Sequence, residues 1–260
     1  MKRTAYRLPA SGVAPDIGCH FFSQGDWQQS NVPLPYEVSL TIRINGHELV
    51  TILCTPTNLD WLVYGFLYSE DIINDTGEVA RMDIDEDTMI ADVWLDETAD
   101  TTIPLRTRTP SGISFNKHGE PVTSDLIVRP EQLLNLMAQL QQQQKMFQQS
   151  GGIHCSALAT PERLLVATED IGRHNTIDKV LGKCLLETIP TQDRILLTTG
   201  RISSEMLLKA SKMQTPVISS RGAPTEHAIT MGKNLGITVA GFVRENRLSV
   251  FSHEARLYQE

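Results

Sequence analysis

The sequence predicts an α/β protein, α+β overall, in which a small N-terminal α+β domain precedes a larger C-terminal domain of three layers. After Gly151 short apolar runs alternate with amphipathic segments, which is typical of a sheet that helices cover on both faces. Before residue 130 hairpin-like runs surround a single amphipathic segment. We therefore expect an irregular lead-in over residues 1–35, the small domain over residues 36–129 and the large domain over residues 130–260.

The small domain begins with a β-hairpin signal. Residues 1–35 mix Gly, Pro, Ser and Gln with isolated aromatic residues, a composition that favours irregular structure. From Glu37 onward apolar and polar residues alternate strictly, and Asn45-Gly46 is a strong two-residue hairpin turn. The apolar run over residues 49–54 supplies the returning strand.

An amphipathic helix follows this hairpin and is expected to pack on it. It starts after residues 55–58 and ends near residues 69–73. Its apolar side consists of Leu59, Leu62, Val63, Phe66 and Leu67. Alternating runs over residues 82–94 and a strand over residues 101–107 complete the small domain.

The large domain opens with a helix at Pro130 that continues through a glutamine-rich face to residue 149. From Gly151 the sequence predicts a hairpin and a helix, followed by alternating strands and helices. The later strands are expected over residues 194–198, 217–220 and 237–243, and the helices between them over residues 203–213 and 225–235.

Residues 151–179, GGIHCSALATPERLLVATEDIGRHNTIDK, form the densest polar stretch of the chain. Runs over residues 153–160 and 164–168 flank a Pro-Glu-Arg turn and predict a hairpin. A helix then starts near residues 172–175, directly after a strand, and leaves unpaired N–H groups with positive potential at its first turn. Such a helix start is a natural seat for an anion.

The strand-to-helix loops of the large domain share one chemistry. Ligands of α/β sheets collect where strands end and helices begin. The pocket residues that we expect are Asp170, Arg173 and His174 in the first loop, Gly200, Arg201 and Ser203 in the second, and Arg221 in the third. Glycine permits close backbone approach, and guanidinium and hydroxyl groups bind oxyanions. The pattern indicates a phosphate or dinucleotide pocket.

Purely structural roles are open for each of these residues taken singly. Asp170 can cap the helix, and Arg173 can pair with Glu169. His174 can be a solvated first-turn residue, and the arginines of the other loops can be surface charges. The presence of Arg beside Gly in all three loops favours the shared pocket.

Several functional classes are excluded. None of the loops is a Walker loop or a Rossmann fingerprint. The ligands of a zinc deaminase are missing. His154 is followed by Cys155 and Ser156, so it does not begin an H-x-E motif, and no P-C-x-x-C motif follows it. We therefore expect no metal site. The net charge of −8 argues against nucleic-acid binding. Without a membrane-length apolar run or a signal peptide, we expect a cytoplasmic protein.

The cysteines, Cys19, Cys54, Cys155 and Cys184, are scattered and form no C-x-x-C pair. This spacing argues against a zinc ribbon and a disulfide framework, and we expect reduced thiols.

Three motifs resemble the signature of the FdhD family, the formate dehydrogenase accessory or sulfur carrier proteins. They are GGIHCSAL at residues 151–158, EDIGRHNTIDKVLG at 169–182 and TTGRISSEMLLKA at 198–210. The resemblance extends over nearly everything after Glu37. It implies a cytidine-deaminase-like arrangement of the C-terminal domain.

The resemblance also implies binding of the molybdenum cofactor in its Mo-bis(molybdopterin guanine dinucleotide) form, for which GDP is a possible surrogate. The cofactor's phosphates suit the pocket described above. A family segment that contributes to this site corresponds by position to Phe242, Val243, Arg244, Glu245, Asn246 and Arg247.

Family members that move sulfur are thought to receive it from a cysteine desulfurase as a persulfide on a C-x-x-C loop, and to deliver it to the cofactor before insertion into formate dehydrogenase. The corresponding stretch here, RTRTPSGISF at residues 106–115, contains no cysteine. Cys155 is the one cysteine inside a matched motif and is our candidate for a sulfur-bearing nucleophile. Alternation with Ile153 and Ala157 favours a packing role for the same residue.

The leading hypothesis is therefore a sulfur carrier of sulfurtransferase type that is required for formate dehydrogenase activity. The alternative is a non-catalytic cofactor chaperone that has lost persulfide chemistry. A third possibility is a nucleotide-acting enzyme that uses Glu169 or Asp170 as an acid or base. The implied partners are a cysteine desulfurase, a formate dehydrogenase and a second copy in a homodimer, without nucleic acid or membrane.

Overall fold

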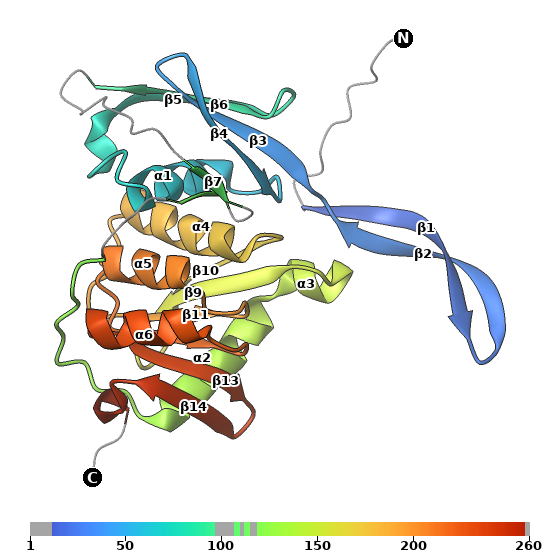
Figure 1. The fold of residues 1–260 in the computed structure, drawn as a ribbon. Coiled ribbons are helices and arrows are strands. Elements are labelled where there is room, and N and C mark those ends of the chain that lie inside the picture. The colour runs from blue at the N-terminus through green and yellow to red at the C-terminus, as the bar shows by residue number, and fades with distance from the viewer. Residues whose placement is uncertain (1–11, 97–106, 110–111, 115–118, 258–260) are drawn as a thin grey trace.

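The computed structural model describes residues 12–96, 107–109, 112–114 and 119–257. Two main sheets, one of four and one of six strands, stack through the helices α1 and α4 that lie between them (Figure 1). A separate two-stranded ribbon projects from this body. The mixed α/β class that the sequence predicts is confirmed.

The projecting ribbon consists of β1 (Val13–Ser23) and β2 (Asp26–Pro35), paired antiparallel. The irregular lead-in expected for residues 1–35 is therefore wrong for this part of it. Gln24 and Gly25 both have positive φ, the conformation of a tight two-residue hairpin turn. The amino-acid composition did not indicate this hairpin, because its strands are largely polar.

The four-stranded sheet forms the core of the small domain. Its strands are β3 (Val38–Ile44), β4 (His47–Cys54), β5 (Val79–Asp85) and β6 (Ile90–Leu95), in the order β4-β3-β6-β5. The turn at Asn45-Gly46 has positive φ at both residues, which confirms the predicted hairpin. The helix α1 (Leu59–Ser69) packs its predicted apolar side on this sheet, and a 3-10 turn over Thr76–Glu78 leads into β5.

The short strands β7 (Thr107–Thr109) and β8 (Gly112–Ser114) pair antiparallel, and β8 lies beside β4. They lie within the cysteine-free stretch over residues 106–115. The strand predicted over residues 101–107 lies, except for its last residue, outside the described residues.

The six-stranded sheet has the order β10-β9-β11-β12-β13-β14. It consists of β9 (His154–Ala159), β10 (Leu164–Asp170), β11 (Ile195–Thr198), β12 (Val217–Ser220), β13 (Thr238–Arg244) and β14 (Arg247–Ser252). The neighbours β11, β12 and β13 are parallel, whereas the other pairs are antiparallel. The parallel strands end at one edge of the sheet, so the loops that follow them lie together.

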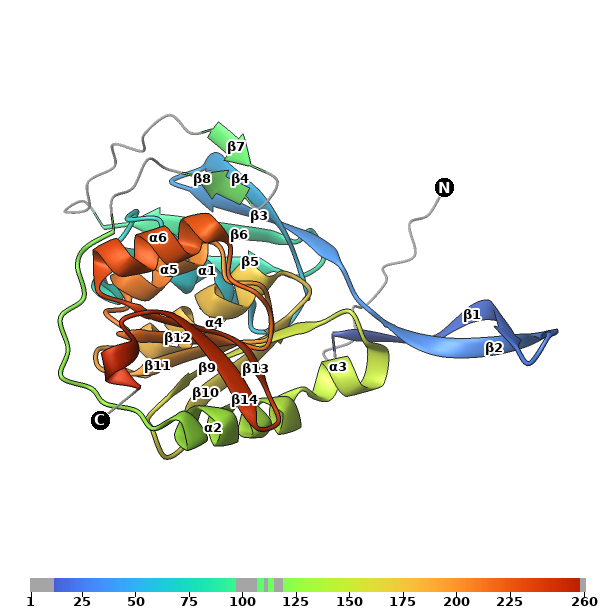
Figure 2. The ribbon, with the colours of Figure 1, turned by 60° about the horizontal axis from the view of Figure 1, so that its bottom comes forward.

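Helices cover both faces of this sheet (Figure 2). One face packs on α2 (Pro130–Gln143), which the short α3 (Lys145–Ser150) continues after a break at Gln144. The other face packs on α4 (Arg173–Leu186), α5 (Ser204–Lys212) and α6 (Glu226–Leu235). A 3-10 turn over Glu254–Arg256 follows β14. The single helix expected over residues 130–149 is thus two helices.

The two domains meet where α1 crosses α4 with backbone against backbone. A Cβ atom added to Gly65 would overlap the carbonyl oxygen of Asp178, and one added to Gly182 would overlap that of Trp61. Glycine at both positions is therefore what allows the helices to approach so closely. This contact fixes the small domain against the first helix of the candidate site.

Candidate functional site

The candidate site lies at the edge where β10, β11 and β12 end. Asp170 is the last residue of β10, and α4 begins at Arg173 after Gly172. The second loop joins β11 to α5, and the third joins β12 to α6. The order of the strands in the sheet therefore brings these strand-to-helix loops to one edge, as the sequence predicts.

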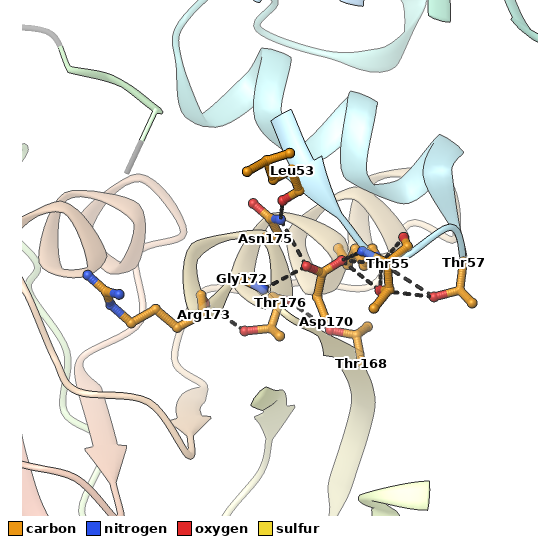
Figure 3. Close-up of polar contacts among 10 residues, drawn as sticks. Leu53, Thr55, Thr57, Thr168, Asp170, Gly172, Arg173, Asn175 and Thr176 are labelled. Carbon is orange, nitrogen blue, oxygen red and sulfur yellow. Dashed lines mark hydrogen bonds and ion pairs between the residues drawn. The ribbon is translucent and has the colours of Figure 1, made fainter. Parts of the chain in front are cut away.

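Asp170 does not face this edge, because it is completely buried against the small domain (Figure 3). Its Oδ2 accepts hydrogen bonds from the Thr55 amide at 3.1 Å and the Thr55 hydroxyl at 2.9 Å. Its Oδ1 accepts from the Gly172 amide at 2.8 Å and Asn175 Nδ2 at 2.9 Å. Both oxygens are occupied by the protein. The prediction of Asp170 as a ligand-binding residue is corrected to a role in joining the domains.

Lys179 completes this buried cluster. Its Nζ lies 2.6 Å from Asp170 Oδ2 and donates to the Thr55 hydroxyl at 3.1 Å, and its side chain is fully buried. Asn175 Nδ2 also donates to the carbonyl of Leu53 at 2.8 Å. Sequence reasoning missed Lys179. The sequence pattern that could have indicated its burial is its position between Ile177 and Val180, on the inward side of the predicted helix.

A second buried cluster of polar side chains lies further along α4, where this helix meets α1 and α5. Asp178 pairs with Lys209 of α5 and accepts from the Ser69 hydroxyl at 3.0 Å, and Lys209 donates to the same hydroxyl at 3.0 Å. Burial raises the pKa of Asp178, an effect that the Lys209 ammonium opposes. The polar groups of α4 therefore secure it to both α1 and α5.

His174 connects the first loop to the second. Its Nε2 lies 3.1 Å from Ser203 Oγ and 3.3 Å from Glu205 Oε2. Burial, with smaller contributions from Lys209 and Arg173, lowers the pKa of His174 to about 3, so the ring is neutral at pH 7 and its contact with Glu205 is not an ion pair. Both partners share one ring nitrogen, so these residues do not form a Ser-His-acid triad, in which the two nitrogens have separate partners.

Among the predicted site residues, Arg173 and Arg201 bring their positive charges close to each other. Figure 3 shows the Arg173 side chain pointing away from the Asp170 cluster. Burial lowers the pKa of Arg173, and the nearby positive charge of Arg201 lowers it further, while Glu205 opposes the shift. The buried Nε of Arg173 has no hydrogen-bond partner among the described residues. Two neighbouring cations with an unused buried donor favour an anionic ligand.

Gly200 makes this contact between the first two loops possible. A Cβ at Gly200 would lie 2.8 Å from the Cβ of Arg173, too close for any other residue type without movement. His154, which sequence reasoning did not select, lies at the same place, with Nδ1 3.5 Å from the Thr199 hydroxyl. Its position next to Cys155 in a matched motif was the available signal.

The third loop is bonded to the second, but Arg221 points elsewhere. Ser220 Oγ donates to the Gly200 carbonyl at 2.5 Å and accepts from the Gly222 amide at 2.8 Å. Arg221 Nε and Nη1 lie 3.0 and 2.9 Å from the Gln141 side-chain amide, oriented so that its oxygen accepts both bonds. Arg221 therefore lies toward α2, and the expected meeting of all three arginines reduces to Arg173 and Arg201.

The turn between β13 and β14 reaches the same edge. The Phe242 amide donates to the Gly222 carbonyl at 3.0 Å, its φ is +54°, and the residue is 44% exposed. A bulky residue in the left-handed region is strained, a feature that gathers at functional sites. Arg244, Glu245, Asn246 and Arg247 are exposed around the turn. Val243 is fully buried in the core under α2, so its predicted ligand contact is corrected to a packing role.

The cysteines have the surroundings of packing residues. Cys54, Cys155 and Cys184 are buried. Burial raises the pKa of Cys54 and Cys184 to about 12, and it also raises that of Cys155. A thiolate is the nucleophilic form, so the burial of Cys155 beneath α2 favours its packing role, and its role as a nucleophile stays a prediction. Cys19, on the ribbon, is partly exposed.

Glu169 is used in capping rather than in pairing with Arg173. Its carboxylate accepts from the amides of Met146 and Phe147 at 2.9 and 3.0 Å, at the start of α3. Neither Glu169 nor Asp170 is placed to act as an acid or base, which removes the support for a nucleotide-acting enzyme.

In the part of the chain that the structure describes, no three or more His, Cys, Asp or Glu residues gather as a metal site would require. Within the same residues, every helix falls short of the length and apolarity needed to cross a membrane.

Comparisons with known proteins agree on one family. The model of the FdhD/NarQ family matches residues 35–258. The chain is 41% identical over 234 residues to the sulfur carrier protein FdhD of Halalkalibacterium halodurans, a match that covers 85% of this chain and 87% of that protein. It is 37% identical to the sulfur carrier protein FdhD of Bacillus subtilis, over 91% and 94% of the two chains.

A solved structure has the same fold. It is described as a putative formate dehydrogenase accessory protein from Desulfotalea psychrophila, and it superposes with a TM-score of 0.80 over 95% of this chain and 99% of that one. The sequence identity is 23%, so this comparison speaks for the fold alone.

Proposed function

The chain belongs to the FdhD/NarQ family, and from this premise we propose that it serves a formate dehydrogenase as an accessory protein. Its cargo in this proposal is the molybdenum cofactor, Mo-bis(molybdopterin guanine dinucleotide), held while sulfur is delivered to it. The observation that carries the proposal is the neighbouring pair of Arg173 and Arg201 with the unused buried Nε of Arg173.

The residues present fit such a cargo. Guanidinium groups beside a helix start bind phosphate oxygens well, and Gly200 lets a ligand approach the backbone. Phe242 offers an exposed ring next to the third loop, and an aromatic face is a suitable platform for a guanine base. Neutral His174 keeps Ser203 oriented without adding charge.

Two versions of this function differ in whether this chain itself carries the sulfur as a persulfide. The names of the relatives favour a sulfur carrier that receives sulfur from a cysteine desulfurase. The buried thiols and the cysteine-free stretch at residues 106–115 favour a chaperone that holds the cofactor without a persulfide of its own. The geometry of this chain supports the second version better.

GDP binding by calorimetry tests the placement of the pocket. A hydrogen bond to a charged group contributes about 1.5–3 kcal/mol, so Arg173→Ala and Arg201→Ala should each weaken GDP binding by about tenfold or more. Arg163→Ala is the matched control, because Arg163 is an exposed arginine on the turn between β9 and β10 at the opposite edge, and it should bind GDP like the parent. Equal affinity in all four proteins would place the cargo elsewhere.

Persulfide trapping separates the two versions. After incubation with a cysteine desulfurase and L-cysteine, the folded protein should carry no persulfide on Cys54, Cys155 or Cys184, because their burial keeps them as thiols. The same thiols should accept an alkylating reagent after denaturation, which shows that the assay detects them. Sulfur on any of these three in the folded protein would establish the carrier version instead.

A further inference from the structure

His154 is a titratable residue that lies where the first two loops of the candidate site meet. It begins β9, and alternation along this strand puts it on the same face of the sheet as Ser156 and Leu158, which pack on α4. A Cβ added to Gly200 would lie 3.5 Å from Nδ1 of His154 and 2.8 Å from the Cβ of Arg173. The imidazole therefore lies beside Arg173, between the two loops.

The imidazole of His154 is accessible to a ligand. The residue is partly exposed, and its Nδ1 lies 3.5 Å from the Thr199 hydroxyl, which is long for a hydrogen bond. Among the residues that the structure describes, Nε2 has no hydrogen-bond partner. The residues of the second loop that face the ring, Thr199 and Gly200, are uncharged. A phosphate oxygen can therefore take Nε2 as its donor if that nitrogen carries a proton.

The charges around His154 favour the neutral ring in the free protein. Asp170 is its neighbour across β9 and β10, but Lys179 already pairs with that carboxylate at 2.6 Å. On α4, Arg173 is a nearby cation, and His174 is neutral at pH 7. Burial lowers the pKa of His154, Arg173 lowers it further, and Asp170 opposes the shift. The ring therefore lacks a counter-ion of its own.

A bound diphosphate would supply that counter-ion. A terminal phosphate carries a charge of about −1.5 to −2 at pH 7, and the inner phosphate of a diphosphate adds about one more negative charge. Arg173 and Arg201 contribute two positive charges at this place, and Glu205 contributes one negative charge. The ligand's negative charge therefore exceeds the positive charge of the loops. An opposite charge nearby favours the protonated form of a histidine.

We propose that His154 is a third cationic contact for the cargo: its ring takes up a proton as the anion binds, and cargo affinity therefore rises as the pH falls. This inference rests on the proposed function, because the anion is the phosphate-bearing cargo of that function. The direction follows from linkage. The complex holds more protons than the separate molecules, and uptake of one proton raises the affinity by up to about tenfold for each pH unit lowered.

Calorimetry of GDP binding at pH 6.5 tests this inference. Titrations in two buffers that differ in ionisation enthalpy give the number of protons taken up on binding. A histidine restored to its ordinary pKa near 6.5 is half protonated at that pH, so the parent should take up about 0.3 proton or more beyond His154→Gln. Protonation changes of the phosphate itself occur in both proteins and cancel in this difference. His47→Gln is the matched control, because His47 is exposed in the small domain, and it should behave like the parent.

The pH dependence of affinity provides a second readout. The parent should bind GDP more tightly than His154→Gln at about pH 6, and the ratio of their affinities should fall toward one by about pH 8. A purely structural role of His154 would give a ratio that does not change with pH. Equal proton uptake by the parent and His154→Gln would overturn this inference and leave the placement of the cargo intact. A parent protein that does not bind GDP would reject the proposed function, and this inference with it.

NMR of the parent protein avoids any effect of the substitution on folding. The imidazole resonance of His154, assigned by its loss in His154→Gln, is followed against pH with and without saturating GDP. Its pKa should lie below 6.5 in the free protein and rise when GDP is bound. A pKa that GDP leaves unchanged or lowers would show that the ring does not meet the anion, and the proposal would fail.

Discussion

Lys179→Met removes the buried ammonium that Asp170 faces across the domain boundary. Asp170 and Lys179 are both fully buried, with Nζ and Oδ2 2.6 Å apart, and methionine is of similar length. The remaining Asp170 carboxylate keeps its neutral donors from Thr55, Gly172 and Asn175 but loses the ammonium of Lys179. Removing one partner of a buried pair costs about 3–5 kcal/mol, and we expect Lys179→Met to lose that much free energy of unfolding.

The double variant Asp170→Asn, Lys179→Met removes both charges while leaving an amide that can still accept from Thr55. It should recover part of the loss, because no uncompensated charge then remains buried. Urea denaturation followed by circular dichroism measures the two single variants, Asp170→Asn and Lys179→Met, and the double variant in one double-mutant cycle. We expect an interaction free energy of about 2 kcal/mol or more.

Two outcomes would refute this reasoning. A loss below about 1 kcal/mol in Lys179→Met would mean that the pair is not desolvated as the structure shows. Additivity of the two single variants would mean that the residues do not act on each other. Lys183→Met is the matched control, since Lys183 lies one turn further along α4 with a partly exposed side chain, and its loss should stay near the 0–1 kcal/mol of surface pairs.

The remaining predictions concern His174 and the helix crossing. Burial holds the folded pKa of His174 near 3, below the value near 6.5 of an unfolded histidine, so the unfolded state binds the proton first and this residue destabilises the fold as pH falls from about 6.5 to about 3. NMR should therefore show His174 neutral at pH 5, and a chemical shift that titrates near pH 6.5 would contradict this. Gly65→Ala should separate α1 from α4 and cost more than about 3 kcal/mol in urea denaturation, whereas Gly18→Ala on the β1–β2 ribbon, where a Cβ meets nothing nearer than 3.6 Å, should cost about 1 kcal/mol or less. A mild effect of Gly65→Ala would show that the crossing can relax.

Local patterns predicted much of the architecture. The hairpin at Asn45-Gly46, the apolar side of α1 and the alternating strands and helices after Gly151 all follow from short-range periodicity and turn chemistry, and the structure confirms them. The motifs over residues 151–210 were specific enough to indicate the family that the comparisons then showed. The hairpin of β1 and β2 was missed because its strands carry polar residues on both faces, so no alternation of apolar and polar residues marked it.

The sequence by itself determined the family, the fold class and the edge of the sheet at which the polar loops gather, because each depends on neighbouring residues and on strand order. Only the tertiary structure decided which of those loop residues face that edge. Asp170 turns inward because Thr55, distant in the sequence, supplies its donors, and Arg221 turns to Gln141 of α2. The direction in which a polar side chain points depends on which element packs against it. Contacts between segments distant in the sequence determine that packing, and the local sequence pattern does not.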